Sequence, residues 1–420
     1  LVISNITHTF TGGITVKEGV LQTGGNGAAN FGNAANTITM DGGELRTTLT
    51  RTTVNPLVIL KDTTFSKDSG GTARTVTFTN SVTISPGVTI RLRNPAGSAG
   101  AFNLRFTGGL VSDANWEIGQ AGDGLCQLQF MGNTNWPDQV ISGTISGPGI
   151  LRRTSTASGI GAATILTGDN VYTGGTEING GMIGFGRSST GNPVTSGPIG
   201  TGTLTLLDDS VIGFFAHGGD RTIGNAVVFN NVAFDLQIPG EHDLTLTGPI
   251  NLNSTARSIV VTSSGLTTFA GPISGTAAIT KKGSGVLAWS GNNINSGNIT
   301  VSEGTFLVNN TFGSGTGSGS VTVNNGAVLG GTGFIGGPVN VSGSVAPGNG
   351  GIGKLTFNNG ANLSGATVVW ELGANSETDG TYDQIVVAGG DVALGVSSVL
   401  AVNFTGTATA PSAGNAFWQS

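Results

Sequence analysis

The sequence predicts an all-β fold, a right-handed parallel β-helix (β-solenoid), and three observations favour it. Glycine is abundant, with 74 in 420 residues, and lacks the three-residue period that collagen requires. The chain is 37% hydrophobic and only 10% charged, so it can bury a core, unlike a disordered chain. Apolar residues alternate with Thr, Ser or Asn at period two, which is typical of half-buried strands. Glycine interrupts the sequence too often for helices, so we expect essentially none.

The predicted strands recur in a repeated unit, in which a short alternating strand, a polar turn with glycine and another apolar pair follow one another. Ile38–Leu45 (ITMDGGEL), Val321–Leu329 (VTVNNGAVL) and Leu355–Leu363 (LTFNNGANL) share this pattern. Ile14–Gly19 (ITVKEG) likewise matches Ile299–Gly304 (ITVSEG). Such repeats are the signature of a solenoid, in which each coil buries its apolar face only by stacking on its neighbours.

Turn glycines in the C-terminal part give the length of one coil. They are separated by about 21.5 residues on average and are Gly304, Gly326, Gly343, Gly360 and Gly390. Residues 1–420 are therefore predicted to form a single continuous, elongated solenoid of about 20 coils, roughly 90 Å long at the spacing of paired strands.

Two stretches depart from this repeat. Residues 91–137 are predicted to form a wider coil or a bulging loop insertion. Residues 312–320 are rich in Gly and Ser and predict a turn or a flexible connection. We expect the large aromatic side chains Trp116, Trp136 and Tyr172 to be buried rather than to stack on sugars.

Charge and cysteine content exclude several classes of partner. Seventeen Lys and Arg against 23 Asp and Glu give a net charge of −6, the wrong sign for binding nucleic acid. No apolar run approaches the ~20 residues of a spanning helix, so no transmembrane segment is expected in this chain. The single cysteine, Cys126, has no partner for an internal disulfide and is expected to be a small buried hydrophobe.

One block of residues points to a known family. Lys282–Asn293 (KGSGVLAWSGNN), followed by Ile299–Phe306, resembles the autotransporter-associated β-strand repeat, also called the passenger-associated transport repeat. Related blocks occur at Phe10–Leu21 and Leu166–Gly175, and Tyr382–Val387 resembles the end of such repeat regions. The resemblance implies a right-handed parallel β-helix that is secreted or lies on the surface of a bacterium, in stalks, adhesins and other passengers.

Catalysis is tested first at two adjacent carboxylates, because parallel β-helices include pectin-degrading enzymes. Asp208 and Asp209 are followed by His217. Carboxylates that act on one sugar bond must face a shared cleft about 5 to 10 Å apart, whereas consecutive residues in a strand point to opposite faces. We interpret the pair as a turn capped by Ser210. A polysaccharide lyase or hydrolase is therefore the least favoured alternative, and we expect no enzyme.

Two histidines form a first candidate metal site. His217 and His242 lie 25 residues apart, about one coil, so stacking of coils would bring them together on one surface. Two histidines with a carboxylate would suit zinc. Solvated polar turns are the alternative interpretation.

An acidic stretch near the C-terminus forms a second candidate metal site, for calcium. Asn375, Glu377, Asp379 and Asp383 copy the alternation of oxygen ligands in a calcium loop. The twelfth position of such a loop holds a bidentate Glu, and here it is Val386. An acidic turn without an ion is the alternative, so we expect no cofactor unless calcium binds here.

Both ends of the chain are predicted to be uncapped strands. Leu1, Val2 and Ile3 begin midway through a repeat, and Phe417 and Trp418 lie in an apolar segment without a terminal turn. End coils of a solenoid expose unpaired backbone groups and core side chains unless polar caps cover them. We therefore expect these five residues to take part in self-assembly, through end-to-end stacking into a homopolymer.

Together these features predict an extracellular, non-catalytic structural protein that forms a fibre, sheath or surface stalk by end-to-end stacking. The alternative is a monomeric adhesin passenger, in which a side loop such as residues 91–137 binds a glycan or a host surface. Electron microscopy of concentrated protein separates the two, because the first predicts filaments.

Overall fold

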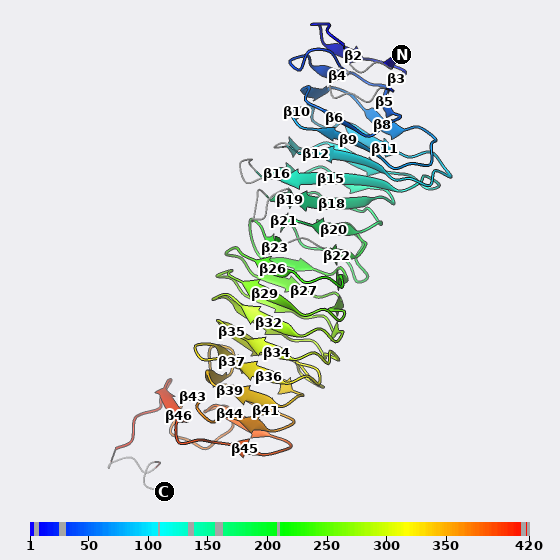
Figure 1. The fold of residues 1–420 in the computed structure, drawn as a ribbon. Coiled ribbons are helices and arrows are strands. Elements are labelled where there is room, and N and C mark those ends of the chain that lie inside the picture. The colour runs from blue at the N-terminus through cyan, green and yellow to red at the C-terminus, as the bar shows by residue number, and fades with distance from the viewer. Residues whose placement is uncertain are drawn as a thin grey trace. The chain divides into compact units, whose positions relative to one another are not determined.

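The computed structural model describes residues 1–3, 8–24, 31–107, 110–132, 138–155, 163–207, 211–412 and 417. The chain divides into two compact units, Leu1–Val227 and Val228–Ser420, and both consist of short strands joined by turns (Figure 1). The described residues contain no α-helix, and hence no apolar helix of membrane-spanning length.

The described strands of the first unit stack in four ladders. The first ladder contains β1 (Val2–Ile3), β3 (Val20–Thr23), β5 (Glu44–Thr47), β8 (Thr63–Lys67), β11 (Thr89–Arg93), β14 (Asn115–Ile118) and β17 (Ile145–Ser146). The second contains β2 (Ile14–Val16), β4 (Ile38–Met40), β7 (Leu57–Ile59) and β10 (Val82–Ile84). The third contains β6 (Arg51–Thr53), β9 (Arg74–Phe78), β12 (Phe102–Phe106), β15 (Cys126–Gly132), β18 (Ile150–Ser155), β20 (Thr176–Asn179) and β22 (Leu204–Leu206). The fourth contains β13 (Val111–Ser112), β16 (Gln139–Ile141), β19 (Thr164–Leu166), β21 (Gly181–Phe185) and β23 (Val211–Ala216), and β24 (Arg221–Ile223) follows it in the chain.

The second unit repeats this arrangement, after β25 (Val227–Phe229) at the unit boundary. One ladder contains β26 (Asp235–Ile238), β29 (Arg257–Val261), β32 (Ile279–Lys282), β34 (Ile299–Val301), β36 (Val321–Val323), β39 (Val339–Val341), β42 (Ala361–Asn362) and β45 (Val392–Ala393). Another contains β27 (Leu244–Leu246), β30 (Thr267–Phe269), β33 (Val286–Trp289), β35 (Thr305–Val308), β37 (Val328–Gly331), β40 (Ser344–Pro347), β43 (Thr367–Leu372) and β46 (Val399–Phe404). The shorter ladders are β28 (Ile250–Asn251) with β31 (Ile273–Ser274), and β38 (Phe334–Ile335), β41 (Lys354–Phe357) and β44 (Gln384–Val387).

Strand partners within each unit run parallel and lie one coil apart, so the prediction of a parallel β-solenoid is confirmed. The predicted number of about 20 coils was too high, since the structure has about 15 turns. The reason is the variable length of a coil. Val321 pairs with Val339, 18 residues later, whereas Gly181 pairs with Ile212, 31 residues later.

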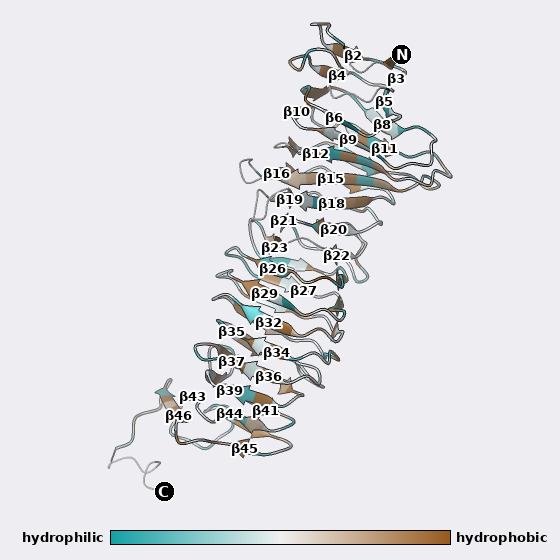
Figure 2. Ribbon diagram, viewed as in Figure 1, coloured by the Kyte–Doolittle hydropathy of each residue, from teal (hydrophilic) through white to brown (hydrophobic). Residues whose placement is uncertain are grey.

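The core of each unit consists of columns of inward-facing side chains, because alternate strand residues point to one face. Figure 2 shows apolar and polar residues interleaved along the strands. In the first unit the rings of Phe78, Phe106 and Phe130 stack at centroid distances of 5.8 and 6.4 Å. Trp116 meets Phe106 edge-on at 5.7 Å. Such pairs add about 0.5–1.5 kcal/mol each to the stability that burial gives.

The burial expected for the large aromatic residues and for the cysteine is confirmed. Trp116 and Tyr172 have no exposed surface, and Cys126 is 1% exposed. Trp136 lies outside the described residues. Burial raises the pKa of the Cys126 thiol to about 12, so the thiol stays protonated and unreactive near neutral pH.

Four of the five marker glycines occupy the left-handed backbone region that favours glycine. Gly304, Gly326, Gly360 and Gly390 have φ angles between 63° and 83°. Gly343 is needed for a different reason, because a Cβ atom there would collide with the carbonyl oxygens of the preceding coil. The glycine excess therefore serves both turn conformation and close stacking of turns.

Candidate binding groove

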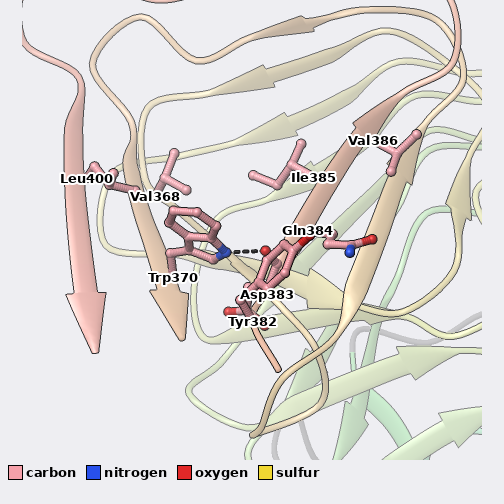
Figure 3. Close-up of a pocket in the computed structure, with 8 residues that line it drawn as sticks. All are labelled: Val368, Trp370, Tyr382, Asp383, Gln384, Ile385, Val386 and Leu400. Carbon is pink, nitrogen blue, oxygen red and sulfur yellow. Dashed lines mark hydrogen bonds between the residues drawn. The ribbon is translucent and has the colours of Figure 1, made fainter. Parts of the chain in front are cut away.

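A pocket of about 400 Å³ opens near the last coil of the second unit, between β43, β44 and β46 (Figure 3). Its lining combines aliphatic, aromatic and polar side chains, and we name it the aromatic groove: Val368, Trp370, Tyr382, Asp383, Gln384, Ile385, Val386 and Leu400. Binding pockets for small ligands commonly have volumes of about 300–1,000 Å³ and this kind of mixed lining.

The groove arises because inward-facing columns of the solenoid are open here. Val345 is fully buried and pairs with Val368, which in turn pairs with Leu400. Leu400 therefore continues a core column, yet it is 57% exposed. Ile385 continues another column above the fully buried Leu355. The groove is thus lined by side chains that the alternation of the strands directs toward the core.

Two aromatic rings form one wall of the groove. The rings of Trp370 and Tyr382 lie 6.0 Å apart at an angle of 89°. The indole N–H of Trp370 donates to the backbone carbonyl of Asp383, and Figure 3 shows this bond. Because this bond fixes the indole ring, the ring orientation is set by the backbone rather than by a ligand.

Asp383 organises the backbone beneath the groove. Its side chain is 1% exposed, and its two carboxylate oxygens accept hydrogen bonds from the backbone N–H groups of Gly353 and Glu371, both at 2.8 Å. Burial raises the pKa of Asp383, whereas the two backbone donors act in the opposite direction. This carboxylate therefore joins β41, β43 and β44 at one point.

A second, more polar pocket of about 260 Å³ adjoins the aromatic groove and shares Tyr382 and Gln384 with it. Asp379 and Lys354 also line it. The side-chain amide of Gln384 donates to the Asp379 carboxylate at 2.8 Å. An apolar surface and two side chains of opposite charge thus lie side by side.

Three of the four residues of the predicted calcium loop have separate partners. Asn375 exchanges hydrogen bonds with Thr409, Asp379 accepts from Gln384, and Asp383 accepts from the backbone. Glu377 is exposed. In the described part of the chain, no three His, Cys, Asp or Glu side chains are arranged to hold a metal ion. The calcium site stays a prediction.

The two predicted histidine ligands lie in different units. His217 is exposed in the first unit, where its carbonyl accepts a hydrogen bond from the Arg221 guanidinium at 2.7 Å. His242 belongs to the second unit, where its Nε2 lies 3.7 Å from the Glu241 carboxylate. Neither belongs to a cluster of three metal-ligating side chains within the described ranges. The candidate catalytic carboxylates Asp208 and Asp209 lie outside the described residues.

The residues predicted to mediate self-assembly are partly described. Leu1 is 82% exposed and Val2 is 59% exposed, whereas Ile3 is buried. Strand β1 lies at the edge of its ladder, and the α-amino group donates to the carbonyl of Val20 at 3.0 Å. Phe417 is partly exposed, and Trp418 lies outside the described residues.

Sequence reasoning missed the aromatic pair of the groove and the role of one lysine. Tyr382 lies in a recognised repeat block, but Trp370 comes from another strand, and only the folded coil brings the two together. Lys281 is fully buried, and its ammonium donates to the carbonyls of Gly283, Gly285 and Glu303 at 2.6, 2.6 and 3.0 Å. In a chain with so few charges, a lysine two residues before a glycine-rich turn could have indicated this role.

Comparison with known proteins identifies the repeats. The family described as passenger-associated transport repeat matches residues 1–22, 161–183 and 279–308. The autotransporter adhesin BmaC of Brucella suis biovar 1 (strain 1330) is 30% identical over 178 residues, which cover 37% of this chain and 5% of that adhesin. The chain thus spans a small part of the length of its relative. The third match, residues 279–308, contains Lys281 and the glycine-rich turn to which it donates. The block that resembles the family in sequence therefore includes a turn between two strands of the solenoid. Three segments of this chain are thus similar to the passenger-associated transport repeat, and part of the chain is similar to an autotransporter adhesin.

Proposed function

We propose that this chain is a solenoid segment of an extracellular passenger of a bacterial surface protein, and that it acts in adhesion without catalysis. The observation that carries the proposal is the series of parallel ladders, built by a chain with three passenger-associated transport repeats. The similarity to an adhesin supports the same role. In such a segment the solenoid positions adhesive surfaces away from the cell.

The interior chemistry supports a structural role. Buried cations in both units donate to oxygen atoms of nearby turns and strands. Lys67 donates to Gly70 and Ser98, Arg153 donates to Met182, and Lys281 donates to three carbonyls. These donors bind oxygen atoms in neighbouring coils and so hold the coils together, which fits a structural role.

Deletion of this chain from the parent surface protein tests the proposal. Attachment of the deletion strain to surfaces that the wild-type strain colonises is expected to fall, and restoring the chain is expected to restore attachment. Surface detection of the remaining protein controls for loss of export. Unchanged attachment by a strain that still exports the remainder would contradict the adhesive role, and release of sugars from polysaccharides by the purified chain would contradict the non-catalytic role.

Self-assembly into a fibre is a second candidate, favoured by the exposed apolar edge of β1. Leu1 and Val2 are largely exposed on this edge strand, and edge strands with free backbone groups promote pairing between chains. The proposal predicts filaments in electron micrographs of concentrated protein, and fewer of them for Val2→Asp. Monomers alone at high concentration would exclude it.

A further inference from the structure

A third pocket of the second unit, of about 210 Å³, lies across β35, β37, β40 and β43. Each of these four strands pairs with a neighbour on both edges, since β33 precedes β35 and β46 follows β43. The pocket therefore lies on the side of the solenoid and not at an open strand edge. We name it the lateral pocket, and most of its lining comes from Leu307, Gly330, Ala346, Val369, Glu371 and the turn 347–351.

The floor of the lateral pocket faces outward, away from the core. The fully buried residues of the three earlier strands are Phe306, Leu329 and Val345. Because side chains alternate along a strand, the next residues, Leu307, Gly330 and Ala346, point to the opposite side, and they pair in register. No side chain fits at Gly330, since a Cβ atom there would lie 2.7 Å from the carbonyl oxygen of Ala346. The outer surface therefore sinks between Leu307 and Val369.

Apolar residues at these outward positions differ from the hydroxyl side chains found elsewhere on the solenoid. The column of Leu307 holds Thr268 two coils earlier and Thr245 three coils earlier. Another ladder of the same unit has a row of three outward threonines: Thr280, Thr300 and Thr322. The change to Leu, Gly, Ala and Val gives the lateral pocket an apolar floor, which suits the apolar part of a ligand.

A glycine-rich turn forms one rim of the lateral pocket. Residues 347–351 follow β40, and Gly348 exchanges two backbone hydrogen bonds with Gly331, at 2.7 and 2.8 Å. These bonds hold the turn in place, so that Gly350 and Gly351 bring main-chain groups to the pocket. A Cβ atom at Gly350 would meet no other atom within 4 Å. This rim therefore leaves space for a ligand to enter.

Glu371 brings a negative charge to the lateral pocket. Its backbone is held by Asp383, whose carboxylate accepts from the N–H of Glu371 and whose N–H donates to the Glu371 carbonyl, both at 2.8 Å. Within the described ranges, no Lys, Arg or His forms an ion pair with the half-buried side chain of Glu371. Residues 283–420 contain six acidic side chains and one basic side chain, Lys354. The charge of this region therefore favours a cation.

Lys281 shows how this fold holds an alkylammonium group. Its ammonium donates to the carbonyls of Gly283 and Gly285 in a glycine-rich turn, and to the carbonyl of Glu303. The lateral pocket likewise combines the main chain of a glycine-rich turn with an acidic residue, Glu371. It adds an apolar floor, so it suits an ammonium ion that carries a short apolar chain.

We propose that the lateral pocket binds an alkylammonium group, which belongs to a free amine or to a lysine side chain of another molecule. The Glu371 carboxylate and the main chain of the turn 347–351 hold the ammonium, and the alkyl chain covers Leu307, Ala346 and Val369. The volume of about 210 Å³ is smaller than the roughly 300–1,000 Å³ of pockets for drug-sized ligands, so the pocket accepts a single short chain.

Saturation-transfer difference NMR with the full 420-residue chain tests this inference. The probe is n-pentylammonium, and 1-pentanol is its uncharged analogue. We expect saturable binding of the amine with a Kd on the order of 1 mM, and binding of 1-pentanol at least about threefold weaker. Nα-acetyl-lysine amide separates the two sources of the ammonium group. Binding as tight as that of n-pentylammonium assigns the pocket to lysine side chains, whereas no binding assigns it to free amines.

Three variants locate the binding site. Ala346→Leu fills the floor from the outer face and is expected to weaken binding of the amine at least about tenfold. Glu371→Gln is expected to weaken it about threefold and to reduce its dependence on salt. Glu377→Gln removes an exposed carboxylate of the same unit and should leave binding unchanged.

Circular dichroism of each variant checks that the solenoid is folded. Absence of saturable binding of n-pentylammonium would overturn the inference. Equal binding by the Glu371→Gln and Glu377→Gln variants would also overturn it, because the charge of Glu371 would then play no part. Undiminished binding by Ala346→Leu would place the amine at another site and would equally contradict the proposal.

Discussion

At the residue scale, buried cations close the turns of this solenoid. Lys281 donates to three carbonyls, and the Arg257 guanidinium lies 4.8 and 5.2 Å from the ring centroids of Phe234 and Phe229. The three carbonyls that Lys281 binds lie in turns, and that of Gly285 also accepts from the backbone N–H of Thr305 at 3.4 Å. Removal of the cation takes a donor away from those acceptors, at about 1–3 kcal/mol for each lost partner that water does not replace.

Lys281→Met tests this role. We expect the variant to lose about 1–3 kcal/mol of unfolding free energy, because the carbonyls of Gly283 and Glu303 lose the lysine donor and that of Gly285 keeps only the backbone N–H of Thr305. Lys282→Met is the matched control, since Lys282 is partly exposed and lies 3.9 Å from Asp235. Its effect should stay within about 0.5 kcal/mol. Urea unfolding measures both, and equal effects would contradict a special role for Lys281.

The pH dependence of stability gives a second readout of the same lysine. Burial lowers the pKa of Lys281 from its ordinary value of 10.5 to about 8. Between these two values the unfolded chain binds the proton and the folded chain does not, so unfolding free energy should rise as the pH increases from 8 to 10.5. The Lys281→Met variant should lack this component. The lowered pKa would be contradicted if the unfolding free energy of the wild type fell with increasing pH at least as steeply as that of the variant.

Cys126 provides a residue-scale test of core packing. Its thiol is 1% exposed and burial raises its pKa to about 12, so the reactive thiolate is scarce below pH 9. A thiol-specific maleimide is expected to leave the native chain unlabelled at pH 7.5 and to label one site in denaturant. Rapid, complete labelling of native protein would contradict the buried position. A higher pH should speed the labelling of unfolded protein, in which the thiol is exposed, and should not speed the labelling of native protein.

At the element scale, turns stack so closely that some glycines have no room for a side chain. A Cβ atom at Gly143 would collide with the carbonyl oxygen of Ala114 in the preceding coil. Gly71 has open space around the corresponding position and no left-handed φ angle. The two glycines lie in the same unit, so they make a matched pair.

Gly143→Ala is therefore expected to destabilise the first unit by about 1–3 kcal/mol. Gly71→Ala is expected to be neutral or to stabilise by about 0.4–1 kcal/mol, because it reduces the entropy of the unfolded chain. Thermal unfolding followed by circular dichroism measures both. A Gly143→Ala variant as stable as Gly71→Ala would show that the turns can move apart at little cost.

Individual strands were predictable because they depend on local alternation, whereas contacts between coils were not. The alternation at Val321–Val323 predicted a half-buried strand, and its burial pattern is buried, intermediate, buried. Trp370 and Tyr382 meet because the chain turns back after β43, where Tyr382 forms an isolated antiparallel bridge with Leu372. Asn375 and Asp379 share a ligand-like spacing in sequence, whereas in the fold each is engaged by a different neighbour, and spacing alone does not predict those contacts.

At the scale of the whole molecule, each coil contacts its neighbours, and stability is the sum of coil and interface contributions. The passenger-associated transport repeats occur in both units, at residues 1–22, 161–183 and 279–308. In the proposed function, such a chain works outside the cell, as part of a surface passenger.

Labelling of intact bacteria with a membrane-impermeant maleimide tests this claim most directly. Ile294 is 76% exposed, so Ile294→Cys places a reactive thiol on the surface of the second unit, and buried Cys126 keeps the unmodified chain silent as the internal control. We predict strong labelling of the Ile294→Cys protein on intact cells and none of the wild type. Labelling of Ile294→Cys that requires cell lysis would contradict the account.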